Sequence, residues 1–171
     1  MNVTFHALGS FATAAVLSLG ASENWRSISA LKKYAIGFAA GILVHGILDY
    51  LPHSYPLPSK FDVIFAISLS GGMLYLVQKQ NRFLVLVCFA GCVFPDVVDL
   101  SPTIIKKYLD IEIPALPFRV FPWHLKKYSG SIYDGSRQIE SNIYHFSFLL
   151  ICFGLLYANR KRFFRFYKIE E

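Results

Sequence analysis

The chain has 171 residues, a formal net charge of +6 and a hydrophobic content of 54%, and its mean hydropathy is +0.43. This apolar content exceeds what a soluble domain of this length requires, so the composition indicates a membrane protein. The basic residues form short clusters between apolar segments, which is typical of membrane-flanking charge and argues against a nucleic-acid-binding surface. A chain this short cannot hold a membrane bundle plus a large soluble domain, so we expect one membrane-embedded domain over 1–171.

Five apolar segments follow in chain order, each near or slightly below the roughly 20 residues that a helix needs to cross a bilayer. We expect them at approximately 3–19, 34–51, 63–77, 83–100 and 143–157. Helices are the form expected for all five, because unpaired backbone groups are costly in hydrocarbon. The sequence therefore predicts an all-α integral membrane bundle of about five transmembrane helices. We also expect one long extracytoplasmic loop over 101–142 and a basic cytoplasmic tail over 158–171.

Small residues inside these segments indicate how the helices pack. Gly37 and Gly41 form a Gly-x-x-x-Gly pair in the second segment, which permits close approach of a neighbouring helix. Cys88, Cys92 and Cys152 lie inside apolar segments without the spacing of a metal-binding motif. We expect these cysteines to be small buried side chains, and neither disulfides nor metal ligands.

The distribution of basic residues predicts the orientation of the bundle. The first connection carries Arg26, Lys32 and Lys33, and the short third connection carries Lys79 and Arg82. Together with the C-terminal tail, these regions are denser in Lys and Arg than the long loop on the other side. Because cytoplasmic connections are rich in basic residues, we expect an integral protein of the bacterial cytoplasmic membrane with its N-terminus outside and its C-terminus inside.

All five histidines and three of the aspartates fall at the outer end of this predicted bundle. They are His6, His45, Asp49, His53, Asp96, Asp99, His124 and His145. Spans drawn from hydropathy alone bring them together, so the convergence is independent of any assumption about histidine. His45 and Asp49 are one helical turn apart and share a face. Pro52 predicts the helix end, which lets His53 turn back, and Pro95 suits a helix first turn or a kink.

Imidazole and carboxylate groups in this setting favour a metal site. Carboxylates in apolar segments are costly unless they are paired or metal-bound. We predict one or two divalent ions held by these eight residues, with Zn²⁺ favoured and Mn²⁺ or Fe as alternatives. Such ions activate water and polarise an ester or phosphoester, so Asp49 and Asp96 are candidate catalytic groups, as ligand or as base. Lys126 and Lys127, close to His124, are candidates for binding a phosphate headgroup.

Several of these residues also have a plainer interpretation, and a His-x3-Asp pair on a helix can be a simple hydrogen-bonded pair. His6 is consistent with a surface position near a terminus, and His124 with a place at the membrane interface. Asp99 could cap a following turn. Asp62 and Asp134 fit caps or loops, and we expect neither in the site.

The same elements resemble the YdjM-like predicted membrane-bound metal-dependent hydrolases. The residues that carry the resemblance are His6, the Pro-Asp-x-x-Asp at 95–99, His124, and His145 in Tyr-His-Phe-Ser. The His-x3-Asp-x3-His at 45–53 is similar to the ligand spacing of zinc-dependent phospholipase C enzymes. The resemblance implies metal-dependent hydrolysis of a lipid or lipid-linked substrate at the outer membrane–water boundary.

Two other functions use the same residues. A metal or proton transporter would place histidines and aspartates inside the membrane, but it needs a second polar layer that the inner halves of the spans do not offer. An accessory structural membrane protein would use the histidines for packing or assembly, and its function would survive substitution of the candidate ligands. A membrane lipid is the expected partner under the first hypothesis, nucleic acid under none, and the sequence carries no signal for the oligomeric state.

Overall fold

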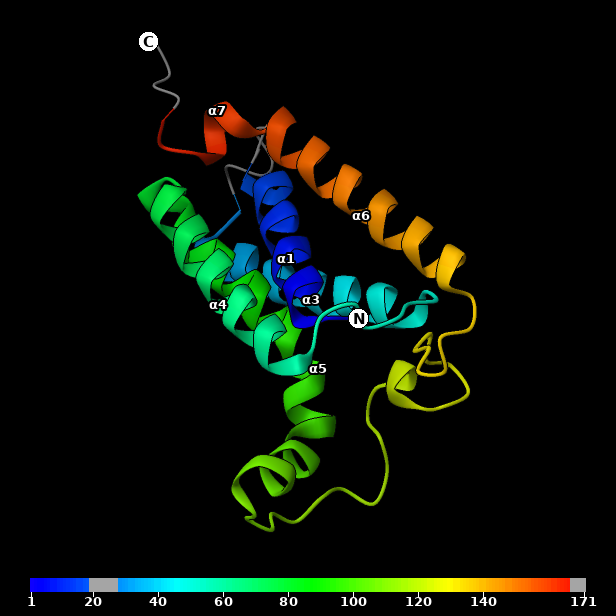
Figure 1. Cartoon of the computed structure of the whole chain (residues 1–171). Coiled ribbons are helices and arrows are strands. Elements are labelled where there is room, and N and C mark those ends of the chain that lie inside the picture. The colour runs from blue at the N-terminus through cyan, green and yellow to red at the C-terminus, as the bar shows by residue number, and fades with distance from the viewer. Residues whose placement is uncertain (19–27, 167–171) are drawn as a thin grey trace.

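A computed structural model describes residues 1–18 and 28–166 of the chain, and this part is all-α (Figure 1). Its helices are α1 (Val3–Ser18), α3 (Ala30–Tyr50), α4 (Ser59–Leu76), α5 (Arg82–Leu109), α6 (Gln138–Ala158) and α7 (Arg160–Phe163). Two 3₁₀ turns, η1 (Lys79–Asn81) and η2 (Pro122–His124), lie between them. Arg26 and Lys168, which belong to the predicted basic clusters, lie outside the described residues.

Four helices, α3, α4, α5 and α6, are long and apolar enough to cross a membrane. The first predicted span forms α1, which has 16 residues. At 1.5 Å per residue it is about 24 Å long, shorter than the roughly 30 Å of a bilayer core. Figure 1 shows α1 in the middle of the bundle, and it contacts α3, α4, α5 and α6. The apolar pattern of the first segment therefore marks a central core helix that the other four surround.

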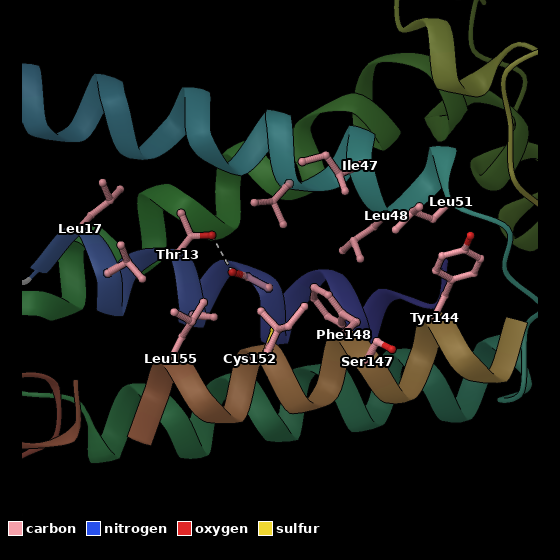
Figure 2. Close-up of a pocket in the computed structure, with 15 residues that line it drawn as sticks. Thr13, Leu17, Ile47, Leu48, Leu51, Tyr144, Ser147, Phe148, Cys152 and Leu155 are labelled. Atoms are coloured by element: carbon pink, nitrogen blue, oxygen red, sulfur yellow. Dashed lines mark hydrogen bonds between the residues drawn. The ribbon is translucent and has the colours of Figure 1, made fainter. Parts of the chain in front are cut away.

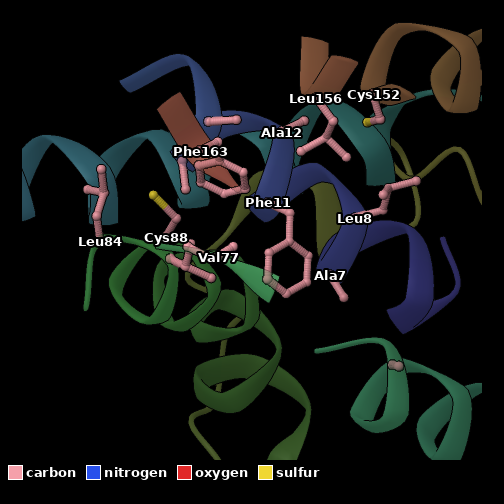
Figure 3. Close-up of a cluster of buried hydrophobic side chains, with 14 residues drawn as sticks. Ala7, Leu8, Phe11, Ala12, Val77, Leu84, Cys88, Cys152, Leu156 and Phe163 are labelled. Atoms are coloured by element: carbon pink, nitrogen blue, oxygen red, sulfur yellow. The ribbon is translucent and has the colours of Figure 1, made fainter. Parts of the chain in front are cut away.

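Small side chains on α1 allow this central position. Ala7, Ala14 and Ala15 are fully buried. Phe11, one turn after Ala7, lies in the same buried cluster (Figure 3). In hydrocarbon, helices associate through packing and not through removal of apolar surface from water, because the lipid tails are as apolar as leucine. A helix rich in alanine is suited to that, since its neighbours can approach the backbone.

The closest helix pair is α3 with α5, and glycines make it possible. A Cβ on Gly41 would lie 2.3 Å from the carbonyl oxygen of Cys88. A Cβ on Gly91 would lie 2.1 Å from that of Phe38. The close approach predicted from the Gly-x-x-x-Gly pair is confirmed at Gly41, and its partner on α5 is a further glycine.

The predicted helix ends are correct for α3 and wrong for α5. Leu51 has extended backbone angles (φ −67°, ψ 141°) and ends α3 before Pro52. Helix α5 continues beyond the predicted end at residue 100, through Pro102, and stops at Asp110 with a left-handed φ of 55°. Hydropathy locates the most apolar segment, whereas these last turns are largely exposed and remain helical beyond that segment. The long loop consequently begins later than predicted.

This loop is joined to the end of α3 by backbone hydrogen bonds. The Gly130 amide donates to the carbonyl of Asp49 (2.8 Å), the His53 amide donates to the carbonyl of Gly130 (2.9 Å), and the Ile132 amide donates to that of His53 (2.8 Å). A Cβ on Gly130 would lie 2.0 Å from the carbonyl oxygen of Leu51, so only glycine permits this approach. The joint fixes η2 beside the end of α3.

The opposite end of the bundle is joined in a similar way. The Gln78 amide donates to the carbonyl of Phe163 (2.9 Å), and the Arg165 amide donates to that of Leu76 (3.0 Å). The α4–α5 connection and α7 thus meet there, and they carry basic residues such as Lys79 and Lys161. A cluster of basic residues therefore lies at the end of the bundle away from the histidines.

Candidate metal centre

Five side chains from four elements meet at the loop end of the bundle. They are His6 of α1, His45 and Asp49 of α3, Asp96 of α5, and His124 of η2. The Nε2 atoms of His6 and His45 each lie 3.2 Å from one of the two carboxylate oxygens of Asp49. The Nε2 of His124 lies 3.2 Å from Asp96 Oδ1. The amino group of Met1 also contacts Asp49.

The hydrogen bonds of two histidine rings determine which nitrogen faces the centre. His45 Nδ1 lies 2.5 Å from the carbonyl oxygen of Cys92, and His124 Nδ1 lies 2.8 Å from Asp99 Oδ2. A carbonyl and a carboxylate only accept, so both Nδ1 atoms carry the hydrogen. Each neutral ring then presents an Nε2 lone pair, and these two Nε2 atoms are 3.3 Å apart. Two acceptors at this separation require a cation or a proton between them.

The spacing of the potential ligand atoms suits one ion. Ligand atoms of His45, Asp49, Asp96 and His124 all lie within 4.8 Å of one another. Bonds of roughly 2.0–2.1 Å in a tetrahedral zinc site place neighbouring ligand atoms about 3.3 Å apart. The separations in the structure run from 3.2 Å for His124–Asp96 to 3.7 Å for His124–Asp49. The donors therefore stand close to the positions that a bound divalent ion requires.

The sequence predicts that Asp99 is a metal ligand, but both of its carboxylate oxygens accept hydrogen bonds from the long loop. One of its carboxylate oxygens accepts the amide of Val120 (2.8 Å), and the other accepts the amide of Phe121 (2.9 Å) and the ring N–H of His124. Its side chain is fully buried. These bonds hold the loop against α5 and orient the His124 ring, which is how an outer carboxylate supports a ligating histidine.

Charge dominates the surroundings of His124. Burial by itself lowers the pKa of this ring, but hydrogen bonds to Asp49, Asp96 and Asp99 outweigh that effect and raise the pKa to about 10. Without an ion at the centre, the ring would therefore take up a proton at neutral pH. A divalent cation would compete with that proton for the same Nε2 lone pair.

Cys92 lies closer to the site than the sequence analysis anticipated. Ligand atoms of His6, His45 and Cys92 form a second group that could hold an ion. Its S–H donates to the carbonyl of His6 (3.3 Å), and its own carbonyl accepts from His45. These bonds fit a protonated thiol whose backbone orients a ligand. The available signal was its place one turn before Asp96, on the same helix face.

His53 and His145 stand outside both candidate groups among the described residues. His53 Nδ1 donates to the carbonyl of Leu51 (2.7 Å), while its Nε2 lies within reach of the hydroxyls of Tyr55 (3.2 Å) and Ser131 (3.3 Å). Burial, followed by the positive charge of the amino terminus, lowers the pKa of His53 to about 4. The ring is therefore neutral, and it fixes the joint between α3 and the long loop.

His145 is buried on α6 against an aromatic ring. Its centroid lies 4.6 Å from that of Phe5, and its Nδ1 lies 3.3 Å from the Ser141 hydroxyl. The Ser141 hydroxyl also bonds to Ser54, which links α6 to the segment after α3. The ring packs between α1 and α6 and is not brought to the Asp49 carboxylate.

Lys126 and Lys127, the predicted headgroup contacts, follow η2 directly and are exposed. The Lys127 ammonium lies 5.2 Å from the Tyr128 ring centroid. Both lysines thus lie on the surface of the loop that carries His124.

Two further residues position the site and were not among the predicted ones. Trp123 rests on Gly46 so closely that a Cβ there would lie 2.7 Å from its ring. Asp62 of α4 accepts the amides of Val3 (2.7 Å) and Thr4 (3.0 Å), which caps the first turn of α1 below His6. The sequence predicts a cap or loop position for Asp62, but spacing cannot reveal that Asp62 caps a different helix.

Comparison of the chain with protein-family models, curated protein sequences and solved structures finds no match.

Proposed function

We propose that this protein is a membrane-bound metal-dependent hydrolase that cleaves an ester or phosphoester bond of a lipid at the outer membrane–water boundary. The observation that carries the proposal is the pair of Nε2 atoms of His45 and His124, 3.3 Å apart, with both Nδ1 atoms committed elsewhere. Two carboxylates border the same point. This arrangement needs a proton or a metal ion between the two nitrogens, and a divalent ion would satisfy both rings and the carboxylates together.

The donor set supports one zinc ion, held by His45, His124 and Asp49, with Asp96 beside them. Nitrogen donors with a carboxylate are typical of zinc, and Mn²⁺ or Fe²⁺ would prefer more oxygen. A bound ion would supply Lewis acidity and a lowered pKa for water at the site. In this assignment Asp99 and the Cys92 carbonyl orient the two rings and do not bind the ion.

Asp96 is the candidate general base. Its side chain is 30% exposed, whereas that of Asp49 is 13% exposed, so Asp96 stands on the open side of the cluster. It remains hydrogen-bonded to His124 there. A carboxylate with access to water and to the ion is placed to accept a proton from the attacking water.

The location of the cluster supports a lipid substrate. It lies where α3 ends and the long loop returns, at one end of helices that are long enough to cross a membrane. Ester and phosphoester bonds of lipids lie at this depth. Lys126 and Lys127 on the adjoining loop would attract a phosphate group.

Transport of a metal or proton has less support. Among the described residues, no buried carboxylate or histidine lies on α1 between Ser10 and its C-terminal end, and the buried core there is apolar. A transport pathway needs polar groups in both halves of the membrane. An accessory structural role would leave the matched orientation of the His45 and His124 Nε2 atoms without a purpose.

The test is hydrolysis of lipids by the detergent-purified protein, without a histidine tag. A total phospholipid extract would be incubated with the zinc-loaded protein, and released fatty acids, headgroups and phosphate would be measured by mass spectrometry. We expect metal-dependent release, lost in Asp49→Ala and reduced about 10²- to 10⁴-fold in Asp96→Ala, the usual contribution of a general base. Leu150→Ala, on the exposed face of α6, is the control and should keep full activity. Full activity in Asp96→Ala, or no product from a zinc-loaded wild type, would overturn the proposal.

A further inference from the structure

A cleft of about 460 Å³ lies between α3 and α6, with α1 as its floor. Helices α3 and α6 each pack on α1 and leave this space between them. Figure 2 shows the cleft running along α1, with Leu51 and Tyr144 towards one end and Leu17 and Leu155 towards the other.

The walls of the cleft are hydrocarbon along most of its length. The hydroxyl of Thr13 donates to the carbonyl of Gly9 (2.8 Å), so it is used within α1. The remaining hydroxyls, those of Tyr144 and Ser147, come from the first half of α6, at the end nearer the metal centre. The cleft is therefore polar at one end only, as a site for an amphiphile requires.

The polar end of the cleft adjoins the metal centre. Leu48, which lines the cleft, is the neighbour of Asp49, and Gly9 is one turn after His6, about 4.5 Å along the axis of α1. From Tyr144 to Leu155 the cleft extends about 16 Å along α6. That is about half of the roughly 30 Å hydrocarbon core, the depth of one leaflet.

The cleft opens on a surface that faces lipid. Ile47 of α3 and Ile151 of α6 border it and are 60% and 59% exposed, on two helices that are long and apolar enough to span the membrane. Water has no polar partners in most of this space, and an empty cleft would forfeit dispersion contacts. One extended hydrocarbon chain fits lengthwise.

We propose that this cleft binds one acyl chain of a membrane lipid and brings the first polar bond of that lipid to the metal centre. The inference rests on the proposed function for the second of these roles. The first, binding of the chain, is independent of catalysis because none of the cleft residues is a candidate ligand.

Photocrosslinking in nanodiscs tests the binding. The probe is phosphatidylglycerol with a diazirine near the end of one acyl chain, and the labelled residues are identified by mass spectrometry. We expect labelling of Thr13, which a lipid can reach only from inside the cleft, above the level on Ile64 of α4, an exposed residue outside the cleft. Ile151→Trp would fill the cleft and lower the labelling of Thr13 to the level on Ile64. Leu150→Trp, the neighbouring residue outside the cleft, should leave it unchanged.

Two results would overturn the inference. They are absence of label at Thr13 in the wild type, and equal label at Thr13 in wild type and Ile151→Trp. Size-exclusion chromatography and thermal unfolding would show whether each variant is folded. If Ile151→Trp fails to fold, Val16→Trp, which fills the same cleft from α1, takes its place.

Asp49→Ala separates this inference from the proposed function. The variant should lose the metal and keep the label at Thr13. Loss of the label from a wild type that binds zinc and cleaves lipids would refute the cleft alone. A labelled Thr13 in a protein without metal or turnover would refute the hydrolase alone. Where both hold, Ile151→Trp should raise the KM for a long-chain lipid and leave a short-chain analogue unaffected.

Discussion

His124 and His53 lie at the same end of the bundle, both outside the long helices, yet the groups around His124 are negatively charged and those in contact with His53 are neutral. The ring of His124 contacts Asp49, Asp96 and Asp99, and its pKa is raised to about 10. The ring of His53 contacts a carbonyl and two hydroxyls, and burial lowers its pKa to about 4. His124 is therefore either protonated or bound to a metal ion, whereas His53 is neutral and forms structural hydrogen bonds.

The comparison shows that the groups in contact with a histidine ring determine its role, and that the sequence motif around the residue does not. His53 belongs to the His-x3-Asp-x3-His stretch that resembles a zinc-binding pattern, while His124 stands in a loop without a metal-binding motif. Carboxylates surround His124 because the long loop folds back over α3 and α5. Four predictions test this contrast.

The largest expected effect is that of the metal on stability. Zinc at about 1,000 times its dissociation constant should stabilise the folded protein by about 4 kcal/mol, because it binds the folded state only. A chelator should remove this gain in the wild type and in His53→Gln alike. The measurement is thermal unfolding in detergent with and without zinc. An equal response to zinc in Asp49→Ala would show that the ion binds elsewhere.

The next effect is the pH dependence of stability that His53 contributes. An unfolded His53 takes up a proton near pH 6.5, but the folded one does so only near pH 4, where its pKa lies. Stability from this residue is therefore complete above about pH 6.5 and falls as the pH drops towards 4, by on the order of 3 kcal/mol. His53→Gln should flatten the unfolding curve in this window, and identical pH profiles for the two proteins would contradict the assignment.

Asp99 should have an intermediate effect, on affinity and not on the presence of the site. Asp99→Ala removes the carboxylate that orients His124, and outer groups of this kind change metal affinity about 10- to 100-fold. A zinc titration against a competing chelator would measure the loss. Affinity unchanged from the wild type would mean that the His124 ring is held in place without Asp99.

The smallest effect is expected at Asp62, which acts on His6 through the first turn of α1. Asp62→Ala leaves the amides of Val3 and Thr4 without their acceptor and should cost about 1 kcal/mol of stability, as loss of a helix cap does. Hydrogen exchange should report faster opening of that turn only. Fraying elsewhere in the bundle would point to a broader role for Asp62.

Local patterns predicted the parts of the site that lie on one element. The four-residue spacing of His45 and Asp49 placed them on one face, where they now lie 3.2 Å apart, and Pro52 predicted the end of α3. Hydropathy located the apolar segments because a helix that can cross a membrane must be apolar along its whole length. It could not reveal that the first segment is a short central helix, since its residues are as apolar as those of a span.

Contacts between residues far apart in the chain form the other parts of the site, and no local sequence pattern reveals them. The path of the loop, fixed by Gly130 against Leu51, decides that His124 reaches Asp49. His145 stays with Ser141 on the face of α6 that meets Phe5. The sequence treats both histidines alike, because only the folded loop distinguishes them.

Metal analysis of the tag-free protein tests the central claim most directly. Wild type, Asp49→Ala and His53→Gln would be purified in detergent under identical conditions and analysed by inductively coupled plasma mass spectrometry. The account predicts about one equivalent of zinc in the wild type and in His53→Gln, and none in Asp49→Ala. A folded wild type without metal, or Asp49→Ala with the wild-type content, would contradict it.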